Sequence, residues 1–311
     1  MKKNIDAATE AFKQNNALFP KKTTKKSVGD CVILICFVFC ALITLYPIYY
    51  VLIGSFNQGK DYISGGIWLF PRVITFDNYI FVLNDQRLYS GLFITLARTA
   101  LGVITSLIFT SCVAYAMSRK KLVGRKFFYW INIFTMFFNG GLIPFYILIV
   151  NIGLYNNFFV YIIPGLYSVF NMIIMSSFFS GIPEDLHEAA EIDGASEFYI
   201  MFSIYFRLSG AVFATVGLWI GVAHWNAYFD TMIYCSANNS LHTLQYYLMR
   251  VIKEASRPAD TSNIPPSVLE EISDQTISFA AIIIACIPVV CAFPFLQKCF
   301  NTGVMVGSLK E

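Results

Sequence analysis

Long runs of apolar residues, separated by short polar segments, dominate the chain after its first thirty residues. A run of roughly 20 apolar residues is long enough to cross the ~30 Å hydrocarbon core of a bilayer. In lipid such a run satisfies its own backbone hydrogen bonds only as a helix. Six spans are predicted, at about 31–56, 92–118, 127–150, 158–179, 211–234 and 277–296. The pattern therefore predicts an all-α polytopic membrane protein with six transmembrane helices.

The polar segments suggest how the chain is organised around these helices. The expected parts are a cytoplasmic tail at 1–28, the first transmembrane helix at 29–56, an extracytoplasmic segment at 57–90, a core at 91–297 and a cytoplasmic tail at 298–311. Turn signals such as Gly65-Gly66 predict that 57–90 folds against the outer membrane surface. Within the core we expect a cytoplasmic loop at 180–210 and an extracytoplasmic loop at 235–276. The second loop is either a contact for a substrate-delivering protein or a mobile polar connector.

Composition and charge support the membrane class and set an orientation. Hydrophobic residues make up 57% of the 311 residues and charged residues only 13%, whereas a soluble domain carries about a quarter charged residues. Lysine and arginine cluster in the leader and in the loop 119–126. The positive-inside rule places both in the cytoplasm, and six spans then return the carboxyl terminus to the same side. The net charge of +3 reflects this topology, and no nucleic-acid partner is expected.

One polar segment inside the apolar core has an unusual make-up. Residues 183–196 read Pro-Glu-Asp-Leu-His-Glu-Ala-Ala-Glu-Ile-Asp-Gly-Ala-Ser, which predicts a short acidic helix, a glycine joint and a second helical segment. Ala189 and Ala190 permit close approach of a partner, and Glu188 can form a charge-assisted hydrogen bond with a partner arginine or lysine. Gly194 can take a positive φ and redirect the chain. The alternative is an ordinary solvated acidic turn.

This segment resembles the EAA loop of the membrane subunits of ATP-driven (ABC) importers, which docks onto the ATPase. The resemblance continues to Ile204, whereas Arg207 stands where the family usually has a proline that bends the chain into span five. The resemblance implies that movement of the ATPase is passed through this loop to spans four and five. The coupling residues that it implies are Glu184, Glu188, Ala189, Ala190, Ile192, Asp193, Gly194, Ala195 and Ile204.

Other segments resemble the carbohydrate branch of this family, which is related to the smaller membrane subunit of the maltose system. They are Ala-Tyr-Ala-Met-Ser-Arg at 114–119, Gly-Gly-Leu-Ile-Pro-Phe-Tyr at 140–146, Trp-Asn-Ala-Tyr-Phe at 225–229 and the glycine-rich tail at 300–310. The second is similar to a sub-branch for larger or modified oligosaccharides. The resemblance covers about 30–311 and implies the type I ABC importer permease fold. It also makes Gly303 and Gly307 candidate contacts to the ATPases.

The resemblance implies an assembly in a bacterial cytoplasmic membrane, with this chain as a multi-pass subunit. The expected partners are a second homologous permease subunit, two ATPase subunits, an extracytoplasmic sugar-binding protein, the carbohydrate and membrane lipid. The chain has no Gly-x-x-x-x-Gly-Lys-Ser/Thr phosphate loop. We therefore expect a transport subunit without enzymatic activity or a cofactor of its own, with ATP and Mg bound by the partner ATPase.

Candidate residues for the substrate pathway are polar or aromatic positions within or near the apolar spans. Intramembrane polar groups usually face the interior, and an aromatic ring can stack on the apolar face of a sugar. The candidates are Arg98, Asn171, Trp219, Trp225, Asn226, Tyr228 and Asp230. Trp225 and Tyr228 can instead belong to an interfacial aromatic belt, and Arg98 can instead extend to the outer interface. His224 is expected to be a packed interior histidine.

Other classes of function remain as alternatives. A stand-alone secondary transporter would require charged relays inside the spans, and an intramembrane enzyme would require a catalytic constellation. The chain has no Cys-x-x-Cys pair, and its three histidines have no metal-ligand spacing, so no metal site is expected. An ABC importer permease for a non-sugar solute such as a peptide remains open, because the acidic loop is common to the whole family.

Overall fold

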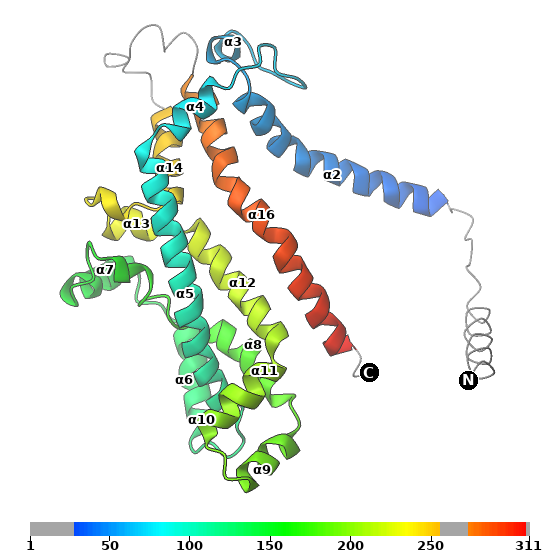
Figure 1. The fold of residues 1–311 in the computed structure, drawn as a ribbon, viewed down its shortest axis with the longest axis vertical. Helices are drawn as coiled ribbons and strands as arrows, with labels where there is room; N and C mark the ends of the chain where they lie inside the picture. The colour runs from blue at the N-terminus through cyan, green and yellow to red at the C-terminus, as the bar shows by residue number, and fades with distance from the viewer. Residues whose placement is uncertain (1–27, 256–272, 309–311) are drawn as a thin grey trace, which may run out of the picture. The chain divides into compact units, whose positions relative to one another are not determined.

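A computed structural model of the chain describes residues 28–255 and 273–308 (Figure 1). Apart from one bridge between Asn57 and Ile74, these ranges contain only helices, turns and irregular segments. The predicted tail at 1–28 lies outside them except for Val28. The chain divides into two units, Met1–Tyr50 and Val51–Glu311. Helix α2 (Val28–Ser55) supplies all of the described part of the first unit and continues five residues into the second.

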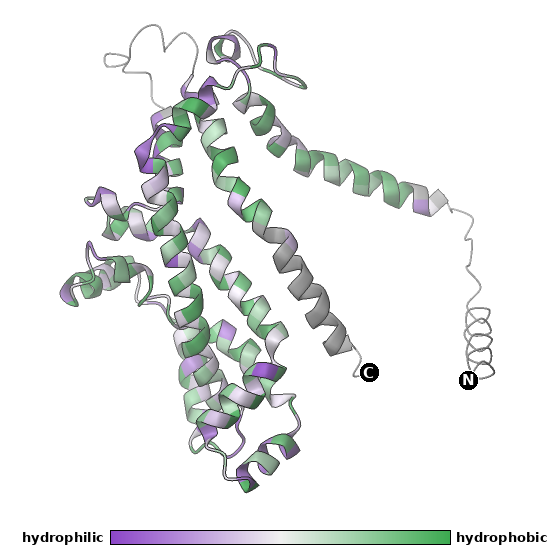
Figure 2. Ribbon diagram, in the orientation of Figure 1, coloured by the Kyte–Doolittle hydropathy of each residue, from purple (hydrophilic) through white to green (hydrophobic). Residues whose placement is uncertain are grey.

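Helix α5 (Gln86–Ser118) has 33 residues and is one of the described helices that are long and apolar enough to cross a membrane. It begins earlier than the predicted 92, because the carboxylate of Asp85 accepts a hydrogen bond from the backbone N–H of Arg87 at 2.9 Å and caps the helix. Helices α8 (Val169–Ser180) and α12 (Gly210–Asn226) pack along α5. Figure 2 shows apolar residues dominating α2, α5 and α12.

Small residues on one side of α5 permit this close packing. Its buried positions include Gly91, Thr95, Gly102, Ser106 and Thr110, a spacing that lets helix backbones approach one another in a membrane. A Cβ added at Gly102 would lie 2.4 Å from Nε2 of His224 on α12, and one added at Gly91 would lie 3.2 Å from the backbone nitrogen of Leu244. The small face of α5 therefore determines how near α12 and the Leu244 segment can come.

The third and fourth predicted spans are interrupted. Helices α6 (Arg125–Phe137) and α7 (Leu142–Asn151) meet at 110°. Gly141 allows this bend through its positive φ of 89°, while Pro144 lies in the first turn of α7, where a proline is tolerated. The fourth span consists of η1 (Phe158–Tyr161), an irregular stretch that includes Pro164, and α8. Pro144 and Pro164 both lie close to the breaks.

The segment between α8 and α12 forms the end of the core where α9 lies (Figure 1). It contains α9 (Glu184–Ile192), α10 (Glu197–Ile200), the π-helix η2 (Met201–Tyr205) and α11 (Phe206–Leu208). The chain bends by 84° between 197–208 and α12. The family usually has a proline at the position of Arg207, so in this chain the bend into α12 forms without that proline.

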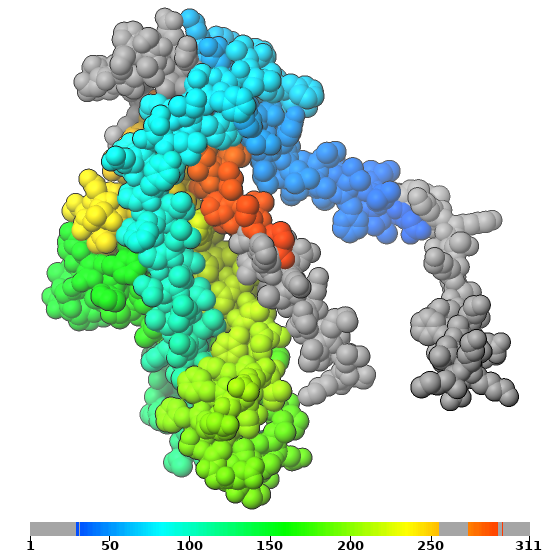
Figure 3. Space-filling model, viewed as in Figure 1, coloured from blue at the N-terminus to red at the C-terminus, as the bar shows by residue number. Residues whose placement is uncertain are grey.

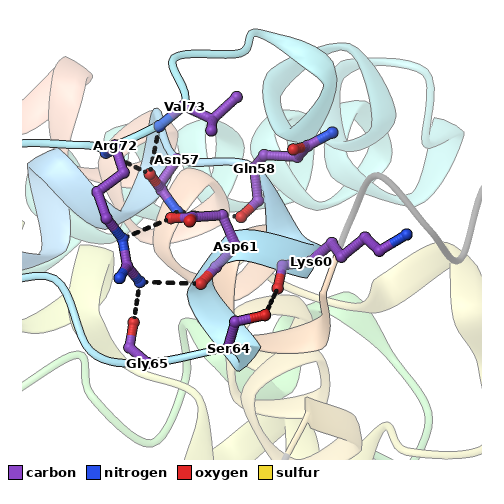
Figure 4. A network of polar contacts seen from close by, with 8 residues as sticks. All are labelled: Asn57, Gln58, Lys60, Asp61, Ser64, Gly65, Arg72 and Val73. Atoms are coloured by element: carbon purple, nitrogen blue, oxygen red, sulfur yellow. Dashed lines mark hydrogen bonds and ion pairs between the residues drawn. The ribbon is translucent and has the colours of Figure 1, made fainter.

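At the other end of the core, a polar network shapes the segment after α2 (Figure 4). The carboxylate of Asp61, on α3 (Gly59–Ile63), accepts hydrogen bonds from Asn57 at 2.9 Å and from Arg72 at 3.0 Å. The hydrogen bond from Asn57, together with the charge and hydrogen bond of Arg72, holds the pKa of Asp61 below its ordinary value. Asn57 also accepts from the backbone N–H of Arg72 at 2.9 Å. The segment is thus folded, with α4 (Asp77–Leu83) as its last helix, and its place against the outer membrane surface stays a prediction.

The expectation of a loop over 235–276 is only partly right. Helix α13 (Phe229–Tyr234) and η3 (Asn239–Leu241) lead into α14 (Leu244–Ala255), which packs against α5 and against α16 (Asp274–Ser308). Leu244, Tyr247 and Leu248 are buried in that contact. Their i, i+3, i+4 spacing is the signal of an amphipathic helix, which the prolines further along the segment obscured. Residues 256–272, which carry those prolines, lie outside the description.

The number of membrane-crossing helices is lower than predicted when only uninterrupted helices are counted. In the described ranges, three helices are long and apolar enough to cross a membrane, within Val32–Ser55, Gln86–Ser118 and Asp274–Cys291. Counting each of the two bent pairs as one span raises the number to five, and α8 is a shorter apolar helix. Six spans and cytoplasmic termini therefore stay predictions.

The close approach at Gly102 gives a prediction about stability. Gly102→Ala places a methyl group against the His224 ring, so we expect a loss of about 1–3 kcal/mol through overpacking. The measurement is the thermal unfolding midpoint of the purified protein in detergent. Gly210→Ala is the control, because an added Cβ there meets nothing within 4 Å. Equal midpoints for the two variants would contradict the packing described for α5 and α12.

Candidate functional site

Helix α9 presents one face to solvent and another to the protein. Glu188, Ala189 and Asp193 are exposed, and Ile192 is 86% exposed, which is unusual for an isoleucine on a polar helix. His187, on the opposite face, is buried to 1%. Figure 3 shows α9 and its neighbours at the lower end of the view. The residues predicted to dock onto the ATPase therefore divide between an open face of α9 and a face that is turned toward the protein.

The inner side of the α9–α10 joint borders a groove of 780 Å³. Gly194 turns the chain there with a φ of 79°, which a residue with a Cβ rarely adopts. The groove brings five predicted coupling residues together with four polar residues that were not among the candidates. Its lining comprises Ala190, Asp193, Gly194, Ala195, Ser196, Tyr199, Ser203, Ile204 and Arg207. Arg207 therefore adds a cation beside the acidic helix.

Glu184 is held within the chain. Nζ of Lys120 donates to its carboxylate at 3.2 Å, and the Arg119 guanidinium lies 3.9 Å away. The hydrogen bond and charge of Lys120, followed by the charge of Arg119, hold the pKa of Glu184 below its ordinary value. A second pair joins Lys121 and Glu191 at 3.7 Å. The basic loop 119–126 therefore neutralises part of α9 as well as marking the cytoplasmic side in the prediction.

A second candidate site is a cavity of 490 Å³ between α5, α8 and α12. It brings together Arg98, Asn171 and Trp219, three of the predicted pathway residues. Arg98, Asn171 and His224 are exposed by only 2%, 8% and 8%, so polar groups are held inside an apolar region. The remaining lining is mixed polar and aromatic: Ser106, Tyr161, Gly165, Ser168, Phe170, Ile220 and Ala223.

Arg98 forms a two-pronged ion pair with Asp230. Its Nη1 and Nη2 donate to the two carboxylate oxygens at 3.1 and 2.5 Å, and its guanidinium lies 4.4 Å from the centre of the Tyr161 ring. The Arg98 side chain is 3% exposed and that of Asp230 is 24% exposed. Arg98 therefore faces its partner and the cavity, and does not extend to the outer interface. Among the residues that line the cavity, Arg98 is the one buried arginine, and the negative charge of Asp230 compensates its positive charge.

The other pathway candidates lie away from the cavity. Trp225 packs into a cluster with Leu244 and Leu248, while Tyr228 is 41% exposed and Asn226 is exposed. Conversely, sequence reasoning assigned His224 to packing alone. In the structure His224 packs and also lines the cavity: its ring fills the space beside Gly102, and it is one of the cavity's lining residues. A histidine facing a glycine across two helices is not visible in a single sequence.

The two tail candidates, Gly303 and Gly307, lie near the end of α16, which continues to Ser308. The predicted tail at 298–311 is thus helical as far as Ser308. The surroundings of these glycines are outside the described side chains, so their contact with an ATPase stays a prediction.

The chain belongs to the family of binding-protein-dependent transport system inner membrane components, which matches residues 102–306. It has the helical fold of type I ABC permeases, and it is the permease component of a carbohydrate ABC importer, a transport subunit and not an enzyme.

Among its relatives is the polygalacturonan/rhamnogalacturonan transport system permease protein YtcP of Bacillus subtilis, 33% identical over 275 residues, which cover 87% of this chain and 94% of YtcP. The arabinooligosaccharides transport system permease protein AraQ of Halalkalibacterium halodurans is 25% identical, over 88% of this chain and 94% of AraQ. A chain from the crystal structure of a bacterial ABC transporter that imports the acidic polysaccharide alginate matches with a TM-score of 0.81 and 32% identity, over 90% of this chain and 99% of that one.

The ion pair in the cavity gives a second stability prediction. Asp230→Asn leaves the Arg98 guanidinium buried without its counterion, and we expect a loss of about 3 kcal/mol. Adding Arg98→Met removes the stranded charge and should recover most of that loss. Thermal unfolding of both variants checks this, and a double variant no more stable than Asp230→Asn would contradict the pairing.

Proposed function

We propose that this chain works in a bacterial cytoplasmic membrane, paired with a second homologous permease. Two ATPase subunits bind at the α9 end, and an extracytoplasmic sugar-binding protein delivers the substrate at the α14 end. The observation that carries the proposal is the open face of α9, where an exposed isoleucine stands among carboxylates at one end of the core. ATP and Mg then bind in the ATPases, whose closure drives alternating access.

We infer that α9 enters a cleft of the ATPase with its open face. Ile192 supplies the apolar anchor, Ala189 permits close approach, and Glu188 pairs with a cation of the partner. The groove beside Gly194 and Ile204 receives a second, smaller contact. Glu184, by contrast, acts from inside the chain, because Lys120 and Arg119 already occupy its carboxylate.

Reversing one charge on this face tests the docking proposal. Glu188→Lys puts a cation opposite a partner cation, so we expect at least a tenfold loss of sugar-stimulated ATP hydrolysis in proteoliposomes. The matched control is Lys126→Glu, an exposed charge reversal on α6 that lies neither on the open face of α9 nor at the α14 end. Membrane insertion of both variants should equal that of the native chain. Normal ATPase stimulation in Glu188→Lys would remove the basis of the docking proposal.

We further propose that the cavity lies on the sugar's path and that the sugar is acidic. The amide of Asn171 can bond hydroxyl groups, and the Trp219 and Phe170 rings can stack on a pyranose face. Arg98 is the cation that a uronate carboxylate would meet, in place of Asp230. Two relatives carry acidic polysaccharides in their names or titles, polygalacturonan and alginate. The alternatives remain a neutral sugar and a non-sugar solute.

Two variants separate the path from the charge preference. Trp219→Ala should lower uptake of any delivered oligosaccharide about tenfold, because the stacking surface is lost. Arg98→Met with Asp230→Asn removes both charges and should weaken binding of tri-galacturonate, but not of neutral galactotriose, to the purified assembly without its binding protein, as measured by calorimetry. Unchanged uptake in Trp219→Ala would contradict the path. Equal loss of both sugars in the double variant would contradict the acidic substrate.

A further inference from the structure

Tyr205 is buried at a point where four elements of the α9 end meet. It lies at the end of η2 and is 2% exposed. The centre of its ring lies 4.9 Å from that of Tyr115 on α5, 6.0 Å from that of Phe179 on α8 and 6.3 Å from that of His187 on α9. In all three contacts the rings meet edge to face, a favourable arrangement for aromatic pairs. Tyr205 therefore connects α9 to the apolar helices α5 and α8.

Polar contacts close around this ring. Nη1 of Arg119 donates to the Tyr205 hydroxyl at 2.9 Å. The hydroxyl of Tyr115 donates to the carboxylate of Glu197, which also lies 3.5 Å from Nε2 of His187. Together with the approach of Arg119 to Glu184, these contacts form a closed set. We name it the tyrosine clasp, and its members are Tyr115, Arg119, Glu184, His187, Glu197 and Tyr205.

The bond between Arg119 and Tyr205 is better able to transmit movement than the ion pair between Lys120 and Glu184. Lys120 is 79% exposed on its side chain, so its pair with Glu184 is a surface ion pair of little strength. The Arg119 side chain is only 14% exposed, and its bond to Tyr205 is charge-assisted and partly buried. A buried polar contact of this kind fixes one geometry, because its separation would leave polar groups without partners.

We propose that the clasp makes α9 and the cytoplasmic end of α5 move as one body, with Arg119 and Tyr205 as its positioning residues. This inference rests on the docking of α9 to an ATPase. Helix α5 carries Tyr115 at the clasp and Arg98 at the cavity, 17 positions apart, which is about 25 Å along a helix. Movement of α9 therefore reaches the cavity through α5, in addition to the route through spans four and five.

The first test uses conservative variants in the complete assembly. Tyr205→Phe keeps the ring and removes only the hydroxyl, while Arg119→Met removes the donor. In each we expect both ATPases to stay bound, while the sugar transported per ATP hydrolysed falls at least threefold. The double variant should be no worse than either single one, because both act through the same bond, and Arg119→Lys should restore part of the coupling. Tyr129→Phe, an exposed tyrosine on α6, is the control.

The outcomes separate the two proposals. If the native chain does not retain ATPases, the docking proposal fails first. If ATPases bind the native chain but are lost from Tyr205→Phe, or if the two single losses add in the double variant, the clasp is not a coupling device. Coupling unchanged in Tyr205→Phe overturns it directly.

A distance measurement tests the same inference without disturbing the clasp. Spin labels at Val123, in the loop after α5, and at Asp185, on the first turn of α9, are both on exposed positions. Their separation should stay constant within about 2 Å between the ATP-free and ATP-trapped assembly. A shift of one helical turn, about 5 Å, would show that α9 and α5 move independently and would refute the clasp.

Discussion

The close packing of α5 against α8, α12 and α14 is the contact on which the rest of the core depends. Lipid offers no hydrophobic driving force between helices, so close approach through small residues and satisfied polar contacts has to hold them together. Gly91 and Gly102 permit that approach, and the hydroxyl of Thr95 accepts a hydrogen bond from the backbone N–H of Leu244 at 2.8 Å. The same helix ends at the α9 region, so one packed element joins the candidate cavity to the candidate docking surface.

Two arginines that the described part of the core encloses have partners. Arg98 has Asp230, and Arg119 has the Tyr205 hydroxyl with Glu184 nearby. Burial of a charge is costly without such a partner, so each pair restricts how its helices can move. When the transporter changes between inward-facing and outward-facing states, each arginine has to keep its partner or exchange it for another. Both pairs can therefore influence which of the two states is favoured.

Much of the architecture could be predicted because it depends on local patterns. Apolar length predicted the long helices, and the resemblance of residues 183–196 to the EAA loop singled out the candidate docking segment. Features that depend on tertiary contact could not be predicted. The α14 helix is fixed by packing on α5, and the pairing of Arg98 with Asp230 joins positions far apart in the chain. The same holds for Tyr205, whose neighbours come from three other elements.

The central claim is that this permease acts as one part of an ATP-driven assembly. The most direct measurement is purification of the tagged chain from its native cells in a gentle detergent, followed by quantitative mass spectrometry of the proteins that accompany it. The account predicts one homologous permease and two copies of an ATPase for each copy of this chain. A chain that purifies alone and transports sugar alone in liposomes would contradict it.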